Sequence, residues 1–421
     1  MRPETRERLA KVDALVQRQE EWRGRGRRTI NLIASENVLS PRARKTLDTD
    51  FHHRYAEGPI GDREYQGVAC VDELEQMCVD LTLELFGAQH AEVRGISGTI
   101  ANLAIYYGLT KPGDELFTLS VPHGAHISFR SFGTAGCRGL RVKDIPFDVE
   151  KLNVDVERLE TAILEERPAM VTLGGSLFLF PHPVEHVKKI CEDLPTLVHY
   201  DASHVLGLVA GGLFQDPLRE GADVVMGSTH KTFPGPQGAI VYTNVEKIHG
   251  KVQRAVFPGL TSSHHLWRLP ALVVTLLEEL EFGKEYARRI VANAKRLAHE
   301  LHRRGFFVLG KDLGYTESHQ VVLNVGELGN GARVAETLEK ANVICNKNLI
   351  WTDSVDDAKD PSGIRLGVQE MTRFGMGESE MAEIAEIFER VLMLDQSPEK
   401  VAKDATELAS RFTQVQYCFP G

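Results

Sequence analysis

A lysine and an aspartate stand where two apolar segments of the chain end. Segments 197–201 and 223–231 are rich in apolar and β-branched residues and finish in polar groups, a pattern typical of buried parallel strands that leave a sheet. Ligands of open α/β sheets bind at the carboxyl ends of the strands. We therefore expect four side chains around one pocket: Asp201, His204, His230 and Lys231.

Asp201 and Lys231 together suit one cofactor. No acidic residue close to Lys231 in the sequence holds its charge, so its amine is a candidate for Schiff-base chemistry. A carboxylate facing that amine is what a pyridinium nitrogen requires. Pyridoxal phosphate is typically held by a lysine and by an aspartate at its ring nitrogen, so the pair predicts this cofactor.

Simpler interpretations of both residues exist. A lysine at a strand end is usually a solvated surface charge, and an aspartate after a strand more often caps a turn or a helix. Here the lysine is followed by a loop whose composition is stiff and tight, with two prolines and two glycines in segment 232–238. This loop, and the abrupt change from apolar to polar residues before it, favour a functional site.

A second segment has the features of a phosphate site. Gly95–Asn102 follows a predicted strand, is rich in small residues and opens a predicted helix. Backbone N–H groups at such a helix start can approach an anion, and the hydroxyls of Ser97 and Thr99 add donors. The same residues also make a good helix cap. After another predicted strand, His126 is a candidate for stacking on the cofactor ring, although an isolated histidine is more often structural.

Composition excludes several classes of protein. The chain has 421 residues, 42% of them hydrophobic and 26% charged, which indicates a globular protein of two domains. A formal charge of −10 without a long basic block argues against nucleic-acid and membrane-surface binding. The short basic cluster 23–28 is interpreted as an exposed linker. The six scattered cysteines indicate free thiols in a reducing cytoplasm.

No targeting or membrane segment is expected, because the first residues are charged and helical in pattern and no apolar run has the length of a bilayer span. We expect a cytoplasmic enzyme without a metal site.

The order of predicted elements indicates an α/β fold. Helices are predicted at 4–22, 71–86, 269–304, 331–341 and, as the last element, 378–394. Strands and helices alternate from 92 to 244, the pattern of a mostly parallel sheet flanked by helices. Strands at 320–325 and 363–367 indicate a smaller C-terminal α+β domain. The expected division is an N-terminal arm (1–40), a large cofactor-binding domain (41–275) and a small domain (276–421).

Several segments, in order over nearly the whole chain, resemble the serine hydroxymethyltransferase family, which comprises pyridoxal-phosphate enzymes of fold type I that interconvert serine and glycine with tetrahydrofolate. The similar segments are 31–37 (NLIASEN), 55–58 (YAEG), 97–98 (SG), 123–126 (HGAH), 201–204 (DASH), 229–232 (THKT), 257–259 (FPG), 346–348 (NKN) and 362–367 (SGIRLG).

The resemblance implies roles for residues at these positions. Lys231 would form the Schiff base, Asp201 would keep the pyridine nitrogen protonated, and His126 would stack on the ring. The remaining cofactor residues would be Ser97, Gly98, Thr99 and His230 at the phosphate, Ser176 and His204 at the phenolic oxygen, and Gly259 from a second subunit.

The resemblance also implies a substrate site. Arg365 would bind the substrate carboxylate with help from Ser35, and a bidentate guanidinium suits that task. Glu57 would act as the acid–base carboxylate beside the hydroxyls of Tyr55 and Tyr65, with Tyr65 supplied by the partner subunit. Such shared sites imply a homodimer or homotetramer that binds an amino acid and either an aldehyde or folate.

Four departures from the family pattern concern the expected mouth of the site. Gln237 replaces an arginine, and 260–265 replaces a glycine-rich run. Val368–Gln369 replaces a Thr-Pro pair, and the loop 349–361 carries Trp351 and several acidic residues. The Gly-Pro-Gln and Gly-Val-Gln variants resemble threonine transaldolases, which transfer a glycine unit to another aldehyde without folate.

Alternative functions therefore remain open at the level of sequence. They are a folate-independent threonine aldolase or transaldolase, an enzyme acting on 2-methylserine, a transaminase of the same fold and a dimeric scaffold without activity. The retention of Lys231, Asp201, His126 and Arg365 counts against a scaffold, which needs none of them.

Overall fold

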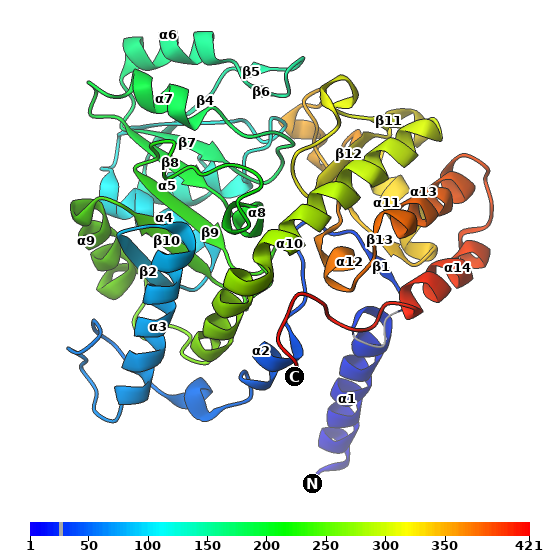
Figure 1. Cartoon of the computed structure of the whole chain (residues 1–421), viewed down its shortest axis with the longest axis horizontal. Coiled ribbons are helices and arrows are strands. Elements are labelled where there is room, and N and C mark those ends of the chain that lie inside the picture. The colour runs from blue at the N-terminus through cyan, green and yellow to red at the C-terminus, as the bar shows by residue number, and fades with distance from the viewer. Residues whose placement is uncertain (25–27) are drawn as a thin grey trace.

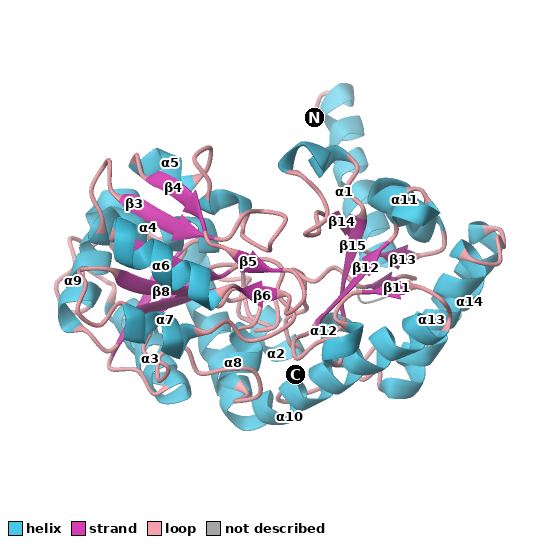
Figure 2. Ribbon diagram, turned by 90° about the horizontal axis from the view of Figure 1, so that it is seen from above, coloured by secondary structure: helices cyan, strands magenta, loops and turns pink. Residues whose placement is uncertain are grey.

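The computed structural model describes residues 1–24 and 28–421, so residues 25–27 of the basic cluster lie outside the described residues. Two sheets lie in separate halves of the molecule, and the long helix α10 (Arg268–Arg303) extends along both of them (Figures 1 and 2). This helix packs against α3 (Ala69–Phe86) in the first half and against α13 (Glu378–Leu392) in the second.

The larger sheet has seven strands in the order β2-β10-β9-β8-β7-β3-β4. Strand β10 is antiparallel to both of its neighbours, and the other pairs are parallel, which confirms the predicted α/β class. Its strands are β2 (His90–Gly95), β3 (Glu115–Thr118), β4 (Arg141–Asp144), β7 (Met170–Gly174), β8 (Leu197–Asp201), β9 (Val224–Ser228) and β10 (Ala239–Thr243).

Helices and short elements surround this sheet. The helices are α4 (Gly98–Leu109), α5 (Thr134–Arg138), α6 (Val156–Glu166), α7 (Val184–Ile190), α8 (Leu206–Ala210) and α9 (Glu246–Arg254). The short elements are the two-residue strands β5 (Phe147–Asp148) and β6 (Asn153–Val154), the 3₁₀ turn η2 (Ile127–Phe129) and the π-helical turn η3 (Ala255–Leu260).

The second half is built on a four-stranded sheet in the order β11-β12-β15-β14. Its strands are β11 (Phe307–Val308), β12 (Gln320–Asn324), β14 (Asn346–Asn348) and β15 (Gly363–Gly367). The helices around it are α11 (Asn330–Lys340), α12 (Gln369–Arg373), α13 and α14 (Pro398–Ser410), with the 3₁₀ turns η4 (Lys311–Leu313), η5 (Gly326–Leu328) and η6 (Val355–Lys359).

The N-terminal arm joins this second half. It carries α1 (Pro3–Arg23) and β1 (Ile30–Asn31), and α2 (Pro41–Lys45) and η1 (Asp50–His53) follow it. Strand β1 pairs in parallel with β13 (Val343–Ile344), far away in the sequence. Helix α1 extends from the body of the molecule and buries none of its residues (Figure 1).

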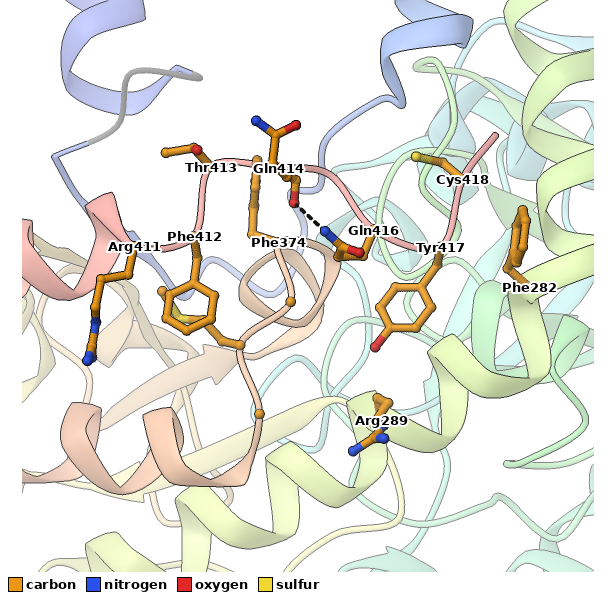
Figure 3. A pocket seen from close by; sticks show the side chains of 13 residues that line it. Phe282, Arg289, Phe374, Arg411, Phe412, Thr413, Gln414, Gln416, Tyr417 and Cys418 are labelled. Atoms are coloured by element: carbon orange, nitrogen blue, oxygen red, sulfur yellow. Dashed lines mark hydrogen bonds between the residues drawn. The ribbon is translucent and has the colours of Figure 1, made fainter. Parts of the chain in front are cut away.

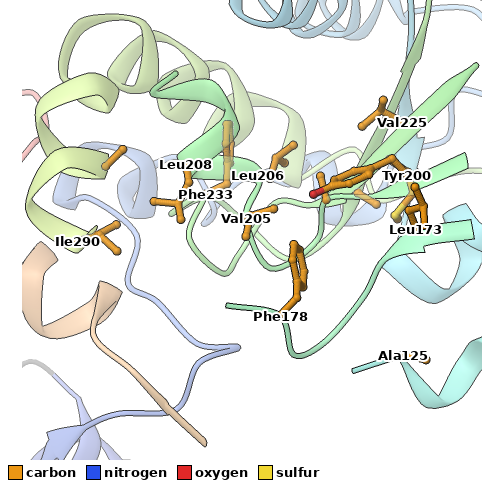
Figure 4. Packing of buried hydrophobic residues seen from close by; sticks show 14 of the residues in the cluster. Ala125, Leu173, Phe178, Tyr200, Val205, Leu206, Leu208, Val225, Phe233 and Ile290 are labelled. Atoms are coloured by element: carbon orange, nitrogen blue, oxygen red, sulfur yellow. The ribbon is translucent and has the colours of Figure 1, made fainter. Parts of the chain in front are cut away.

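The core beneath the larger sheet fixes the loop that carries Lys231. Figure 4 shows Leu206 and Leu208 of α8 between the side chains of the sheet and Ile290 of α10. Phe233, two residues after the lysine, packs into this cluster and is fully buried. Burial of an aromatic side chain stabilises the folded state by several kcal/mol, so Phe233 anchors the loop that follows β9.

Most predicted elements are present within one to two residues of their expected bounds, and all six cysteines are unpaired as predicted. One prediction was wrong, because 378–394 is not the last element: α14 follows it. In the described part of the chain, no helix has the length and apolar character needed to cross a bilayer.

Candidate active site

A cavity of about 510 Å³ lies at the carboxyl ends of the strands of the larger sheet. Residues that follow β2, β7, β8 and β9 line it, as the parallel order of these strands requires. The smaller sheet closes it from the other side with Arg365 of β15 and Asn348 of β14. The cavity thus lies between the two halves of the molecule, where ligand sites are common.

Lys231 and Asp201 both line this cavity, as predicted from the ends of their strands. Asp201 is buried, with its carboxylate accepting hydrogen bonds from the Asn102 amide and the Ser203 backbone N–H, each at 2.8 Å. Lys231 keeps some exposure to the cavity. Burial lowers its pKa to about 8, Arg365 adds to that decrease, and Asp201 opposes it. A neutral amine, the form that attacks a carbonyl, is therefore accessible near neutral pH.

The phosphate candidates lie together at the start of α4. Ser97 is the N-cap of this helix, its Oγ accepting from the Ile100 N–H at 3.2 Å, and it also lines the cavity. The two interpretations of this segment are therefore compatible. A Cβ at Gly98 would lie 2.5 Å from the Ser228 hydroxyl, so only glycine leaves this wall open. His230 lines the cavity too, and its buried Nδ1 has no hydrogen-bond partner.

Three further predicted residues, His126, Ser176 and His204, line the cavity. His126 accepts the Ser128 N–H through Nδ1, and burial lowers its pKa, so its ring is uncharged near neutral pH. His204 is fully buried, which lowers its pKa well below the ordinary value. Its Nδ1 lies 3.1 Å from the amide of Gln320, which also donates to the backbone oxygen of Ser176. Uncharged rings suit contact with a flat aromatic cofactor.

Arg365 and Ser35 mark the candidate substrate side. Arg365 donates to the Ser176 oxygen at 2.8 Å and to Asn346 at 3.3 Å, while its Nε is buried without a partner. Burial lowers its pKa to about 10, so it remains a cation. Ser35 lies in a turn of the N-terminal arm and lines the same cavity. The structure brings these residues together from opposite ends of the chain.

Four predicted site residues do not line this cavity in the single chain: Tyr55, Glu57, Tyr65 and Gly259. The rings of Tyr55 and Tyr65 lie 5.7 Å apart and are 54% and 42% exposed. Glu57 is between them in sequence and Gly259 is in η3.

The departures from the family pattern fall into two groups. Leu349, Ala358 and Pro361 of the loop 349–361 line the cavity, so this loop does shape its mouth. Asp353 holds both ends of the loop, because its carboxylate accepts from the N–H groups of Ile350 and Ser362. In contrast, neither Gln237 nor segment 260–265 lines the cavity of this chain.

Sequence reasoning missed three polar residues. Asn102 donates to Asp201, Gln320 joins His204 to Ser176, and His319 lies 3.1 Å from the Ala34 oxygen. Asn102 could have been found, because a polar residue one turn into an apolar helix indicates a buried partner. The sequence gave no signal for the other two residues, because Gln320 only begins a predicted strand and His319 precedes it.

These residues fit pyridoxal phosphate. One cavity contains a buried carboxylate, an amine with a lowered pKa, an imidazole nitrogen without a partner and a glycine at a helix start.

A second cavity, of about 660 Å³, lies at the C-terminal segment (Figure 3) and is lined by residues such as Arg289, Arg411 and Tyr417. It contains none of the predicted site residues, so the cavity of about 510 Å³ is the better candidate for the active site.

The sheet order and this cavity define an enzyme of the fold type I class. A solved structure of L-threonine transaldolase from Pseudomonas fluorescens, in its internal aldimine state, superimposes with a TM-score of 0.90 at 28% identity, covering 99% of this chain and 96% of that one. Sequence identity is higher to a different group of enzymes than to this transaldolase.

The serine hydroxymethyltransferase family model matches residues 9–388. The serine hydroxymethyltransferase of Methanopyrus kandleri is 51% identical over 404 residues, 96% of this chain and 94% of that protein. Those of Methanocella arvoryzae and Thermococcus kodakarensis are 49% and 48% identical, covering 94% and 98% of this chain and 93% and 96% of the relatives. The chain belongs to the serine hydroxymethyltransferase family.

Proposed function

We propose that the protein uses pyridoxal phosphate to interconvert serine and glycine, with a tetrahydrofolate-type cosubstrate accepting the one-carbon unit. Family membership over nearly the whole chain supports the reaction, and the meeting of Lys231, Asp201 and Arg365 in one cavity supports the cofactor and substrate assignments. When bound, pyridoxal phosphate supplies an electron sink for the electron pair released as the Cα–Cβ bond breaks.

Each protein group has a task in this proposal. Lys231 would hold the cofactor covalently, and the fixed charge of Asp201 would keep the ring nitrogen protonated. The start of α4 would bind the phosphate through backbone N–H groups and the hydroxyls of Ser97 and Thr99. His126 would cover the ring face with an uncharged imidazole.

The substrate groups act on the amino acid itself. Arg365 and Ser35 would bind its carboxylate and so orient the bond to be broken. Glu57, supplied by a second subunit with Tyr55 and Tyr65, would take the proton from the β-hydroxyl in one direction and return it in the other. The observation that carries the proposal is the buried Asp201 facing a lysine whose pKa is lowered to about 8.

The test is conversion of L-serine to glycine by the purified holoenzyme, with and without tetrahydrofolate, because the folate captures the one-carbon unit and no free aldehyde is then released. Serine cleavage that depends on the folate supports the proposal. Replacing Lys231 with Ala should abolish turnover while the fold and the oligomeric state persist. Turnover of that variant at the wild-type rate would contradict the assignment of the lysine.

A second candidate is a folate-independent threonine aldolase or transaldolase. It is supported by the TM-score of 0.90 to the L-threonine transaldolase and by the loop 349–361, which departs from the family pattern and lines the cavity. L-threonine cleavage that is faster than serine cleavage and indifferent to tetrahydrofolate would favour it. The same assay with 2-methylserine tests the third substrate considered.

We also propose a homodimer or homotetramer, located in the cytoplasm, in which two subunits complete each site. Each chain would act as an arm (1–40), a large domain (41–275) and a small domain (276–421). The exposed Tyr55 and Tyr65 support the assembly, since such aromatic side chains are commonly buried at interfaces.

A further inference from the structure

A β-turn of the N-terminal arm carries Ser35 into the cavity. Its first and last residues are Ile33 and Glu36, and the Glu36 N–H donates to the Ile33 oxygen at 3.2 Å. A turn of this kind leaves several carbonyl groups pointing outward, and each needs a donor when it is buried. The position of the Ser35 hydroxyl therefore depends on what binds the turn from outside.

One amide group binds both ends of this turn. The Nε2 of Gln369 donates to the Ile33 oxygen at 2.8 Å and to the Glu36 oxygen at 2.7 Å. Gln369 is fully buried and opens α12, four residues after Arg365. The segment that carries the candidate carboxylate-binding arginine thus also carries the group that holds the Ser35 turn.

The middle of the turn is held as well. The Nε2 of His319 lies 3.1 Å from the Ala34 oxygen, and burial lowers the pKa of this histidine to about 3. The ring is therefore neutral, and because a carbonyl only accepts, Nε2 carries the proton and donates it. The Gly367 N–H also donates to the Leu32 oxygen at 2.8 Å. The turn is fixed to the small sheet along its length.

Gln369 stands at one of the departures from the family pattern, where Val368–Gln369 replaces a Thr-Pro pair. A proline side chain at this position would offer no donor, so the two hydrogen bonds to the turn depend on the glutamine. A buried amide that satisfies two backbone carbonyls is costly to replace by a group without donors.

We propose that Gln369 is a positioning residue that sets the Ser35 hydroxyl relative to Arg365 and thereby the affinity for the substrate carboxylate. This inference rests on the proposed function only in taking an α-amino acid as the ligand. It places the specificity for the carboxylate in a side chain that touches neither the substrate nor the cofactor.

The test compares Gln369→Met with the wild-type holoenzyme. The variant keeps the length of the side chain and loses both donors, so KM for L-serine and the calorimetric Kd for glycine should each rise about fivefold, the size of one or two lost hydrogen bonds, while kcat stays within about twofold. Gln369→Glu, which also lacks the N–H donors, provides a second variant of the same shape.

Asn293→Leu is the matched control. The Asn293 amide is buried and holds the other end of α12 through Thr372 and the Met376 oxygen, so it reports the effect of loosening this helix. The Asn293→Leu variant should leave KM for L-serine and Kd for glycine unchanged. In a double-mutant cycle, Ser35→Ala should give little further loss on top of Gln369→Met, because both act through one hydroxyl.

The outcomes separate the two proposals. Unchanged constants in both Gln369 variants, equal shifts in Asn293→Leu, or additive losses in the cycle would overturn the role of Gln369. A wild-type protein that binds glycine and shows the Gln369 effect, yet does not cleave serine, would overturn the proposed function and leave the positioning role supported.

Discussion

At the scale of residues, burial makes positive charge around the cavity less favourable than it is in water. It lowers the pKa of Lys231 to about 8, that of His230 to about 4 and that of Arg365 to about 10. The cost of burying the Lys231 and Arg365 cations is one that anionic ligands can offset. A phosphate group at the start of α4 and a carboxylate at Arg365 are the ligands that such a site favours, which agrees with the proposed cofactor and substrate.

The lowered pKa of Lys231 predicts how the apoprotein captures the cofactor. Only the neutral amine attacks the aldehyde, so the rate should rise about tenfold per pH unit below 8 and level off above it. A free lysine amine, with a pKa of about 10.4, should continue to gain rate beyond pH 9. Stopped-flow absorbance of both reactions checks the prediction, and a protein profile that keeps rising to pH 10 would contradict it.

At the scale of elements, local pattern predicted much of the fold. Strand 363–367 and the long helix were predictable because β-branched runs and helical periods are local properties of the sequence. The extra helix α14 was missed, and so was the pairing of β1 with β13 across some 310 residues. Pairings of this kind depend on the tertiary fold, which no local window contains.

The same division applies to the candidate site. Lys231 and Asp201 could be placed in one pocket because two parallel strands end beside each other, and Arg365 followed from the family resemblance. The amide of Gln369 and the ring of His319 could not, since their roles exist only after the N-terminal arm has packed against the small sheet.

The close packing of Gly98 at the start of α4 predicts how strongly a substitution there affects cofactor binding. Gly98→Ala would place a methyl group 2.5 Å from the Ser228 hydroxyl, next to the predicted phosphate site. Such overpacking should weaken pyridoxal-phosphate binding about tenfold or more. Gly250→Ala in α9, where a Cβ meets nothing closer than 3.7 Å, is the control and should bind normally. Fluorescence titration of the apoproteins measures both, and equal affinities would contradict the assignment.

Helix α10 carries a buried acid that predicts the pH dependence of stability. Burial raises the pKa of Glu279 to about 8, and the neighbouring pair of Glu278 and Arg373 is buried as well. Between about pH 4.5 and 8 the folded protein keeps the Glu279 proton and the unfolded chain releases it, so stability falls as pH rises. Glu279→Gln removes this dependence.

The variant should gain about 3 kcal/mol of unfolding free energy at pH 7, and the gain should shrink to nothing near pH 4.5. Glu281→Gln, an exposed change in the same helix, should give no such trend. Urea unfolding of the apoproteins from pH 5 to 8 provides the comparison. A gain of equal size at every pH would show that Glu279 is not the titrating group.

At the scale of the whole molecule, one chain contains an incomplete set of the predicted catalytic groups. The cavity holds Lys231, Asp201 and Arg365, while Glu57 and the two exposed tyrosines lie elsewhere. The arm that supplies Ser35 crosses to the small sheet within the same chain, so that part of the site needs no partner. In the assembly that we propose, a second subunit would add the acid–base group, which would separate binding of the amino acid from its cleavage.

This division predicts complementation between two inactive variants. Lys231→Ala loses the cofactor lysine, and Glu57→Ala loses a group that we assign to the neighbouring subunit's cavity. In a mixed dimer one site carries both changes and the other carries neither, so statistical exchange of subunits should restore about a quarter of the wild-type serine cleavage. If Glu57 acts in its own chain, every mixed site carries one change and activity stays absent. The assay is activity after co-refolding equal amounts of the variants, with each variant refolded alone as the control.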